Sequence, residues 1–247
     1  MPKFFRKFRI NAIRDSKIFN YLKYAIGEIL LVTIGILIAV SINNANEKRK
    51  HAGELQAIYK AVENDLIRDS VFLFQEIEED RIMDSIIQKV LAQEVPLVSI
   101  DTITEENYLE CYPCQALHLR YSPFTQSQKG HDALKGFGNN LGDSQDSLSF
   151  KILELYSRYS ELLEDIGVRL GDLAITSLME IEQEPWYLSY INGKYNREAI
   201  EYFLSDPRYK NRLATFSLLN TKNYVNFLID YQRESRELIK EIQKRGE

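Results

Sequence analysis

The chain has 247 residues, of which 45% are hydrophobic and 27% charged, and this length suffices for a domain with its own hydrophobic core. Its formal net charge of -5 is unevenly spread, because residues 1–50 carry ten Lys and Arg against three acidic residues, while the remainder carries 21 Lys and Arg against 33 Asp and Glu. A predominantly acidic domain lacks the dense cationic surface that binds phosphate backbones, so we expect no nucleic-acid partner.

Residues 1–23 form a basic segment that we expect to be cytoplasmic and amphipathic. Its aromatic and basic side chains fit a membrane interface, with rings at the acyl boundary and cations on anionic lipid. The candidate lipid-contacting residues are Phe4, Phe5, Arg6, Lys7, Phe8 and Arg9. A solvated basic tail explains the composition equally well, since Ile10 and Ile13 blur the apolar stripe.

Residues 24–42, YAIGEILLVTIGILIAVSI, contain a single charged side chain, Glu28. A helix rises about 1.5 Å per residue, so this stretch spans roughly 28 Å, close to the thickness of a bilayer's hydrocarbon core. A cleaved signal peptide is the alternative, because residues 29–40 are short enough and 39–41 suit a cleavage site. The long basic leader favours an uncleaved signal-anchor, and hence a single-pass protein of the inner membrane.

The basic residues that flank this span predict its orientation. Six Lys and Arg lie within twenty residues on the N-terminal side, against four on the C-terminal side. Positive charge near a span is usually retained in the cytoplasm. We therefore expect a cytoplasmic N-terminus and a periplasmic main domain, 43–247.

Helical periodicity dominates that domain. Apolar residues recur at intervals of three and four through 54–94, which predicts that the membrane helix continues as a long stalk or coiled coil until Pro96. A second long helix is expected over 148–182, capped by Asp146 or Ser147, and a third from Asp206 and Pro207 to about residue 245. A short helix is expected near 197–204. Few strand signals occur, so the predicted fold is an all-α antiparallel helical bundle.

Two segments interrupt the helical pattern. Residues 95–146 contain prolines, glycines and both cysteines, and are expected to form an irregular connector with short helices. Within it, Gly136, Gly138 and Gly142 lack the spacing and the preceding strand of a dinucleotide-binding turn and indicate a loop. Residues 184–196 are likewise expected to be a loop, whose aromatic side chains around Trp186 favour core packing over ligand binding.

A candidate helix-packing face lies in the membrane span. Its members recur every four residues beside the one carboxylate, and they are Gly27, Glu28, Leu31, Gly35 and Ala39. Small residues let another helix approach closely, which favours a homo-oligomer or a second membrane protein as partner. A carboxylate within a span suggests a proton- or ion-coupled role, as in stator-like accessory subunits. Glu28 is also only one turn inside the interface, where it can snorkel or pair with Lys23.

Cys111, Cys114, His118 and His131 fall within 21 residues of each other. The CxxC spacing suits a disulfide, a pair of unremarkable thiols, a redox pair or, with the two histidines, a zinc site. A thioredoxin-like site would need a βαβ context, which the sequence does not indicate. An oxidising compartment favours the disulfide, and we expect no cofactor, with zinc as the lesser alternative.

The N-terminal block FFRKFRINAIRDSKIFNYLKYAIGEILLVTIGILIAVSINNANE resembles the opening of an uncharacterised family of single-pass membrane proteins from Bacteroidota. The resemblance rests on the FFRK start, the YAIGEI and IGILIA core and the INN exit, where Ala45 replaces an expected tryptophan. The segment ALKGFGNNLGDSQDSLSFKILELYSRY resembles the middle of that family. The resemblance implies an inner-membrane protein with a helical extramembrane domain, and it implies no activity.

No Walker loop, HExxH or GxSxG motif is present in the sequence, so we expect no catalytic residues. The leading hypothesis is a non-enzymatic scaffold, sensor or interaction protein that acts in a membrane complex. The alternatives are an ion-coupled subunit that uses Glu28, and a redox- or metal-active domain at Cys111 and Cys114.

Overall fold

The computed structural model describes residues 18–92, 99–120, 122–141 and 146–246, and most of these are helical, with no strand among them. The chain divides into two units, residues 1–56 and residues 57–247. Helix α2, Ile18–Leu91, contributes to both. The prediction of an all-α fold is confirmed.

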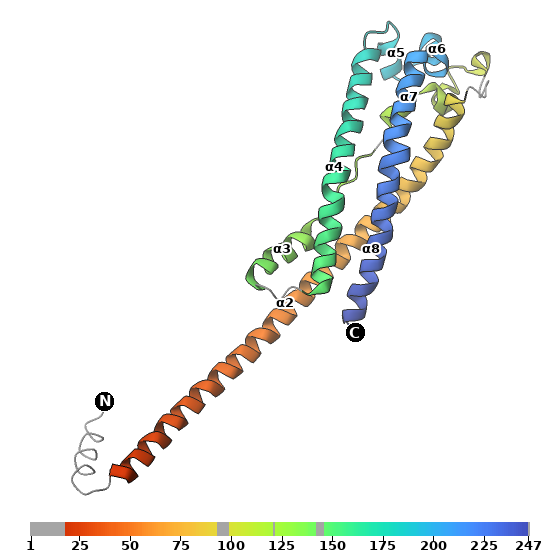
Figure 1. Cartoon of the computed structure of the whole chain (residues 1–247). Coiled ribbons are helices and arrows are strands. Elements are labelled where there is room, and N and C mark those ends of the chain that lie inside the picture. Colours follow the sequence, from red (N-terminus) through yellow and green to blue (C-terminus); the bar gives the residue numbers. More distant parts are fainter. Residues whose placement is uncertain (1–17, 93–98, 121, 142–145, 247) are drawn as a thin grey trace. The chain divides into compact units, whose positions relative to one another are not determined.

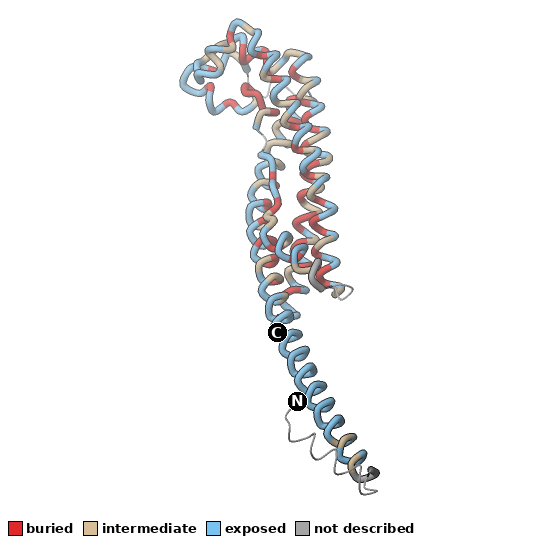
Figure 2. Tube along the Cα trace, turned by 90° about the vertical axis from the view of Figure 1, so that its left-hand side faces the viewer, coloured by how far each residue is buried: buried red, intermediate tan, exposed pale blue. Residues whose placement is uncertain are grey.

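In the first unit, the described residues form the beginning of α2, and the side chains of the apolar stretch lie on its surface. Figure 2 shows this helix in pale blue, the colour of exposed residues. Large apolar side chains from Leu22 to Ile42 are about half exposed or more. The candidate lipid-contacting residues, from Phe4 to Arg9, lie outside the described residues.

The second unit is built from long packed helices. They are the part of α2 from residue 57 onward, α4 (Ser147–Ile181), α7 (Pro207–Leu219) and α8 (Val225–Gly246). Figure 1 shows α4 beside α8, with the short helices α5 (Tyr187–Ile191) and α6 (Arg197–Ser205) at one end. Figure 2 shows that their buried residues, in red, recur along the facing sides.

Ion pairs and hydrogen bonds define the directions of these helices. Lys151 pairs with Glu241, and Arg158 pairs with Glu234, so α4 and α8 are antiparallel. On α2, Glu63 accepts a hydrogen bond from Gln243 and Asp69 accepts one from Tyr231, so α2 is antiparallel to α8 as well. Consequently α2 and α4 run in the same direction. The connector that joins them in the sequence must therefore run back along the bundle.

Local capping explains where these helices begin. Asp146 accepts a hydrogen bond from the Ser149 amide, and Asp206, before Pro207, accepts one from the Arg208 amide. Asn196 caps α6 through the Ala199 amide. The expected third long helix is present as α7 and α8, joined by one π-helical turn at Asn220–Tyr224.

The connector contains four 3-10 turns, η1 (Ile100–Thr102), η2 (Tyr108–Glu110), η3 (Tyr112–Cys114) and η4 (Leu117–Leu119), followed by helix α3 (Lys129–Leu141). The loop predicted at Gly136 and Gly138 is wrong, because both residues lie within α3. That helix packs against α4, and this tertiary contact outweighs the poor helix propensity of glycine.

The segment 184–196 is also more ordered than predicted, since it contains the single-turn helix α5. Trp186 is 3% exposed and packs against Tyr190, Tyr202 and Phe203. Trp186 therefore belongs to the core, as expected, whereas Tyr187, Tyr190 and Tyr195 are half-buried.

Candidate functional site

The candidate helix-packing face lies on the first unit's part of α2. A Cβ atom added to Gly27 or Gly35 would meet nothing within 4 Å, so the surface in front of both glycines is open. Glu28, Leu31 and Ala39 are exposed on the same helix. An open strip of small residues on an apolar helix can accept a second helix at close range.

The two cysteines form a disulfide, with their Cα atoms 5.3 Å apart. Cys114 is fully buried and Cys111 is 9% exposed, and both pack in a cluster with Ile103, Tyr108 and Ile200. The disulfide closes a short turn within the connector, and its packing against Ile200 of α6 places that turn on the end of the bundle. Sulfur atoms in such a core are poorly accessible to thiols or metal ions, which favours a structural role.

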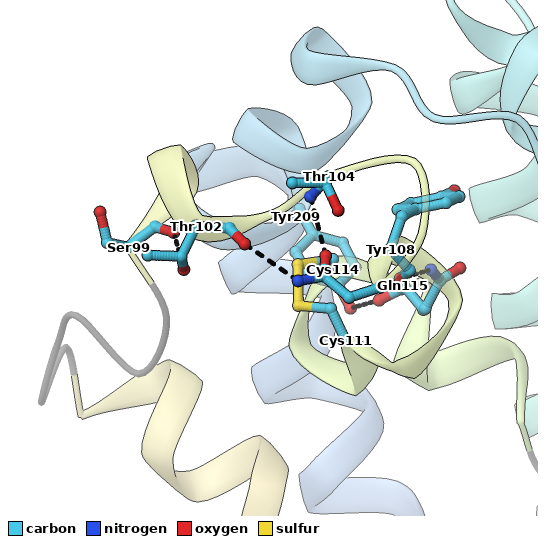
Figure 3. Close-up of a disulfide and its surroundings, with 9 residues drawn as sticks. Ser99, Thr102, Thr104, Tyr108, Cys111, Cys114, Gln115 and Tyr209 are labelled. Atoms are coloured by element: carbon cyan, nitrogen blue, oxygen red, sulfur yellow. Dashed lines mark hydrogen bonds between the residues drawn. A yellow bond between two sulfur atoms is a disulfide. The ribbon is translucent and has the colours of Figure 1, made fainter.

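Hydrogen bonds fix the backbone around the disulfide. The Tyr209 hydroxyl donates to the Gln115 carbonyl at 3.0 Å and accepts from the Leu117 amide at 3.0 Å. The Gln115 side chain donates to the Tyr108 carbonyl at 3.3 Å. Figure 3 shows Tyr108, Gln115 and Tyr209 around the sulfur–sulfur bond. These contacts bury the connector's polar backbone at low cost, because its donors and acceptors are paired.

His118 is buried beside the rings of Tyr209 and Phe216, with centroids 5.6 and 6.5 Å away. Burial, assisted by nearby Arg212, lowers its pKa to about 4, so the ring is neutral near pH 7. Neither ring nitrogen has a hydrogen-bond partner among the described residues.

His131 lies elsewhere, stacked on Tyr156 with centroids 4.8 Å apart. The structure therefore does not gather the four residues considered for zinc. Within the described ranges, no three His, Cys, Asp or Glu side chains are grouped to hold a metal ion.

A polar network in the bundle was missed by sequence reasoning. Asp69 is 3% exposed and accepts hydrogen bonds from the Ser127 amide at 3.1 Å, the Ser127 hydroxyl at 2.7 Å and the Tyr231 hydroxyl at 2.8 Å. Burial raises the pKa of Asp69, while these hydrogen bonds oppose the rise. Asp65, which is 2% exposed, accepts from the Gly130 amide at 2.6 Å. The two carboxylates thus tie the connector and α3 to α2.

The sequence contains a signal for Asp69. Apolar residues of α2 recur at Val62, Leu66 and Leu73, and Asp69 occupies the core position between Leu66 and Leu73. A carboxylate at such a position indicates a buried polar partner.

Comparison with known protein families identifies the family of this chain. The model of a family of unknown function, DUF6090, matches residues 28–168, more than half of the chain. The chain belongs to the DUF6090 family. The matched region begins in the apolar stretch, includes the rest of α2, the disulfide-bearing connector and α3, and ends within α4. This membership agrees with the expectation of a family without an assigned activity. No match was found among curated proteins or among solved structures.

Proposed function

We propose that this protein is a single-pass inner-membrane protein whose periplasmic helical domain is a non-enzymatic scaffold, sensor or interaction module of a membrane complex. The observation that carries the proposal is the apolar stretch of α2. Its most apolar 18-residue window has a mean hydropathy of 2.5, and none of that window is buried. A bilayer would remove these side chains from water, at a gain of about 25 cal/mol per Å².

Two observations support a periplasmic location for the domain. The Lys and Arg count is higher on the N-terminal side of the span, six against four, which favours a cytoplasmic N-terminus. The Cys111–Cys114 disulfide suits an oxidising compartment such as the periplasm.

The arrangement of buried polar groups supports a structural role for the domain. The carboxylates of Asp65 and Asp69 are engaged by the backbone and hydroxyl groups of the same domain, where they hold α3 and the connector. Buried polar groups that are satisfied in this way stabilise one packing arrangement. The open strip at Gly27 and Gly35 supports association of the anchor with another helix, in a homo-oligomer or with a different membrane protein.

Topology mapping of the full-length protein tests this proposal. The protein carries a C-terminal tag. Isolated membranes are extracted with alkaline carbonate, and in a separate experiment intact spheroplasts are treated with protease. We expect the tag to remain in the membrane fraction and to be cleaved in intact spheroplasts. Release of the protein by carbonate would refute the anchor, while protection of the tag would refute the orientation.

Affinity purification in mild detergent then tests the role in a complex. We expect either a defined homo-oligomer or a reproducible membrane partner, and replacement of residues 24–42 with an unrelated apolar span is the matched control. A strictly monomeric, partner-free protein would contradict the interaction role.

A further inference from the structure

The outward face of α4 carries an apolar stripe in the second half of the helix. Val168, Ile175 and Met179 are 58%, 55% and 60% exposed. With 3.6 residues per turn, their spacing of seven and four residues places them within an arc of about 40° on the helix surface. A surface helix usually carries polar side chains on this face, so the stripe is a candidate for covering by a partner.

A hollow of about 590 Å³ continues the stripe toward the beginning of α4, where the non-helical segment 122–128 lies beside the helix. Val168 belongs to both the hollow and the stripe, and the buried side chains of Phe124 and Leu163 add apolar lining. A Cβ atom added to Gly167, in the same lining, would meet nothing within 4 Å. The glycine therefore leaves room for a partner's side chain against α4.

Hydrogen bonds hold the segment away from α4. The Phe124 amide donates to the Tyr224 hydroxyl at 2.8 Å, and the Ser127 amide and hydroxyl donate to Asp69 at 3.1 and 2.7 Å. The Phe124 ring also packs against Tyr231, with centroids 5.7 Å apart. Collapse of the segment onto α4 would break these contacts, so the hollow is formed before a partner binds.

The charge along this face of α4 is negative. Residues 161–181 contain five Asp and Glu and one basic residue, Arg169, which is paired with Asp165. Glu164 and Asp172 line the hollow, where they form no ion pair with a described residue, and the lining contains no Lys, Arg or His. Because each lies four residues from Val168, the two carboxylates flank the stripe on opposite sides, about 40° from its centre.

These charges decide which occupant fits the stripe. A second copy that docked with the same face would place Glu164 and Asp172 against their own counterparts, and like charges repel. An anionic lipid surface would be repelled in the same way. A helical partner with cations beside its apolar residues meets neither obstacle, and it complements the face in both charge and polarity.

We propose that this face of α4, together with the hollow, binds an amphipathic helix whose apolar stripe is flanked by Lys or Arg. The partner's apolar side chains pack on Val168, Ile175 and Met179, and one of them enters the hollow. Its cations pair with Glu164 and Asp172, which are separated by about 12 Å along α4. The inference rests on the proposed interaction role and names the chemistry of the partner.

Fluorescence anisotropy of a labelled peptide, titrated with the full-length protein in phosphatidylcholine nanodiscs, tests the proposal. The probe is an amphipathic helical peptide of about 18 residues, about 27 Å long, with a leucine stripe flanked by lysines. The control peptide has glutamate in place of each lysine, and empty nanodiscs measure binding to lipid. We expect the lysine peptide to bind with a micromolar Kd, and the glutamate peptide to bind at least about tenfold more weakly.

Reversal of the two carboxylates locates the binding by charge. Glu164→Lys combined with Asp172→Lys should weaken binding of the lysine peptide at least about tenfold and strengthen binding of the glutamate peptide. A merely misfolded protein would not gain affinity for the second peptide. Glu105→Lys combined with Glu106→Lys is the matched control, because it changes the net charge equally at exposed residues outside this face, and it should leave the Kd unchanged.

Removal of one apolar contact tests the stripe. Ile175→Ser should weaken binding of the lysine peptide about tenfold, whereas Ile191→Ser, at an isoleucine of α5 that is 54% exposed, should not. Both positions lie on the surface, and circular dichroism checks that each variant is folded.

The proposal is overturned if the wild-type protein does not bind the lysine peptide at about 100 μM above empty nanodiscs, or if it binds both peptides equally. Unchanged binding of the lysine peptide in the double charge reversal, or in Ile175→Ser, overturns it as well. These outcomes are distinct from failure of the proposed function, since a membrane complex purified in detergent that survives the double charge reversal would retain the interaction role and place it elsewhere on the protein.

Discussion

Gly130, near the start of α3, lies against the backbone of α2, and its substitution by alanine tests that packing. A Cβ atom at this position would lie 2.4 Å from the Val62 nitrogen and 2.6 Å from the Val62 Cα. These are backbone atoms inside a helix, so they cannot rotate away as a side chain can. Gly130→Ala therefore forces α3 to move outward from α2.

The cost can be worked out from the contacts that are lost. Overpacking of a close contact costs about 1–3 kcal/mol, and weakening the hydrogen bond from Gly130 to the charged Asp65 costs about 1.5–3 kcal/mol more. The better helix propensity of alanine returns about 1 kcal/mol. We expect a net destabilisation of about 3 kcal/mol, and hence a Tm about 6–12 °C lower for a protein of this size.

Gly136→Ala is the matched control, because Gly136 lies in the same helix and a Cβ atom there would meet nothing within 4 Å. Alanine at this exposed position is expected to raise the Tm by about 2–4 °C through helix propensity alone.

Thermal unfolding of the full-length protein in detergent, followed by far-ultraviolet circular dichroism and by the fluorescence of Trp186, measures both effects. A Tm for Gly130→Ala within about 2 °C of the wild type would refute the close packing of α3 on α2. A similar loss of stability in Gly136→Ala would show that α3 tolerates no alanine, and that the contact with Val62 is not the cause.

Burial raises the pKa of Asp80 to about 6, so its ionisation opposes folding as the pH rises from its ordinary pKa of 3.8 through 6. Asp80→Asn should therefore raise the free energy of unfolding by roughly 1–2 kcal/mol near pH 8 and change it little near pH 4. Urea unfolding at the two pH values measures this, and an equal increase at both would contradict the prediction. Replacing Cys111 and Cys114 by serine should lower the free energy of unfolding by about 2 kcal/mol, which corresponds to a Tm about 4–8 °C lower. Dithiothreitol should lower the Tm of the wild-type protein and leave that of the serine variant unchanged. Gly35→Leu should weaken self-association or partner binding in detergent roughly tenfold. Glu28→Gln should leave the complex intact, and a loss of function in that intact complex would favour ion coupling.

The sequence by itself determined the long helices and the apolar stretch 24–42. Apolar spacing of three and four residues, together with the caps at Asp146 and Asp206, located the long helices because these signals are local. The stretch 24–42 was identifiable because length and hydropathy alone decide whether a helix can span a bilayer.

Only the tertiary structure decided how these helices pack and which polar groups they bury. The helix at Gly136 and Gly138 was missed because its stability comes from packing on α4 and not from its own residues. The same holds for the pairing of Asp69 with Tyr231, residues 162 positions apart in the chain. Contacts over such distances depend on the return path of the connector, which no local pattern encodes.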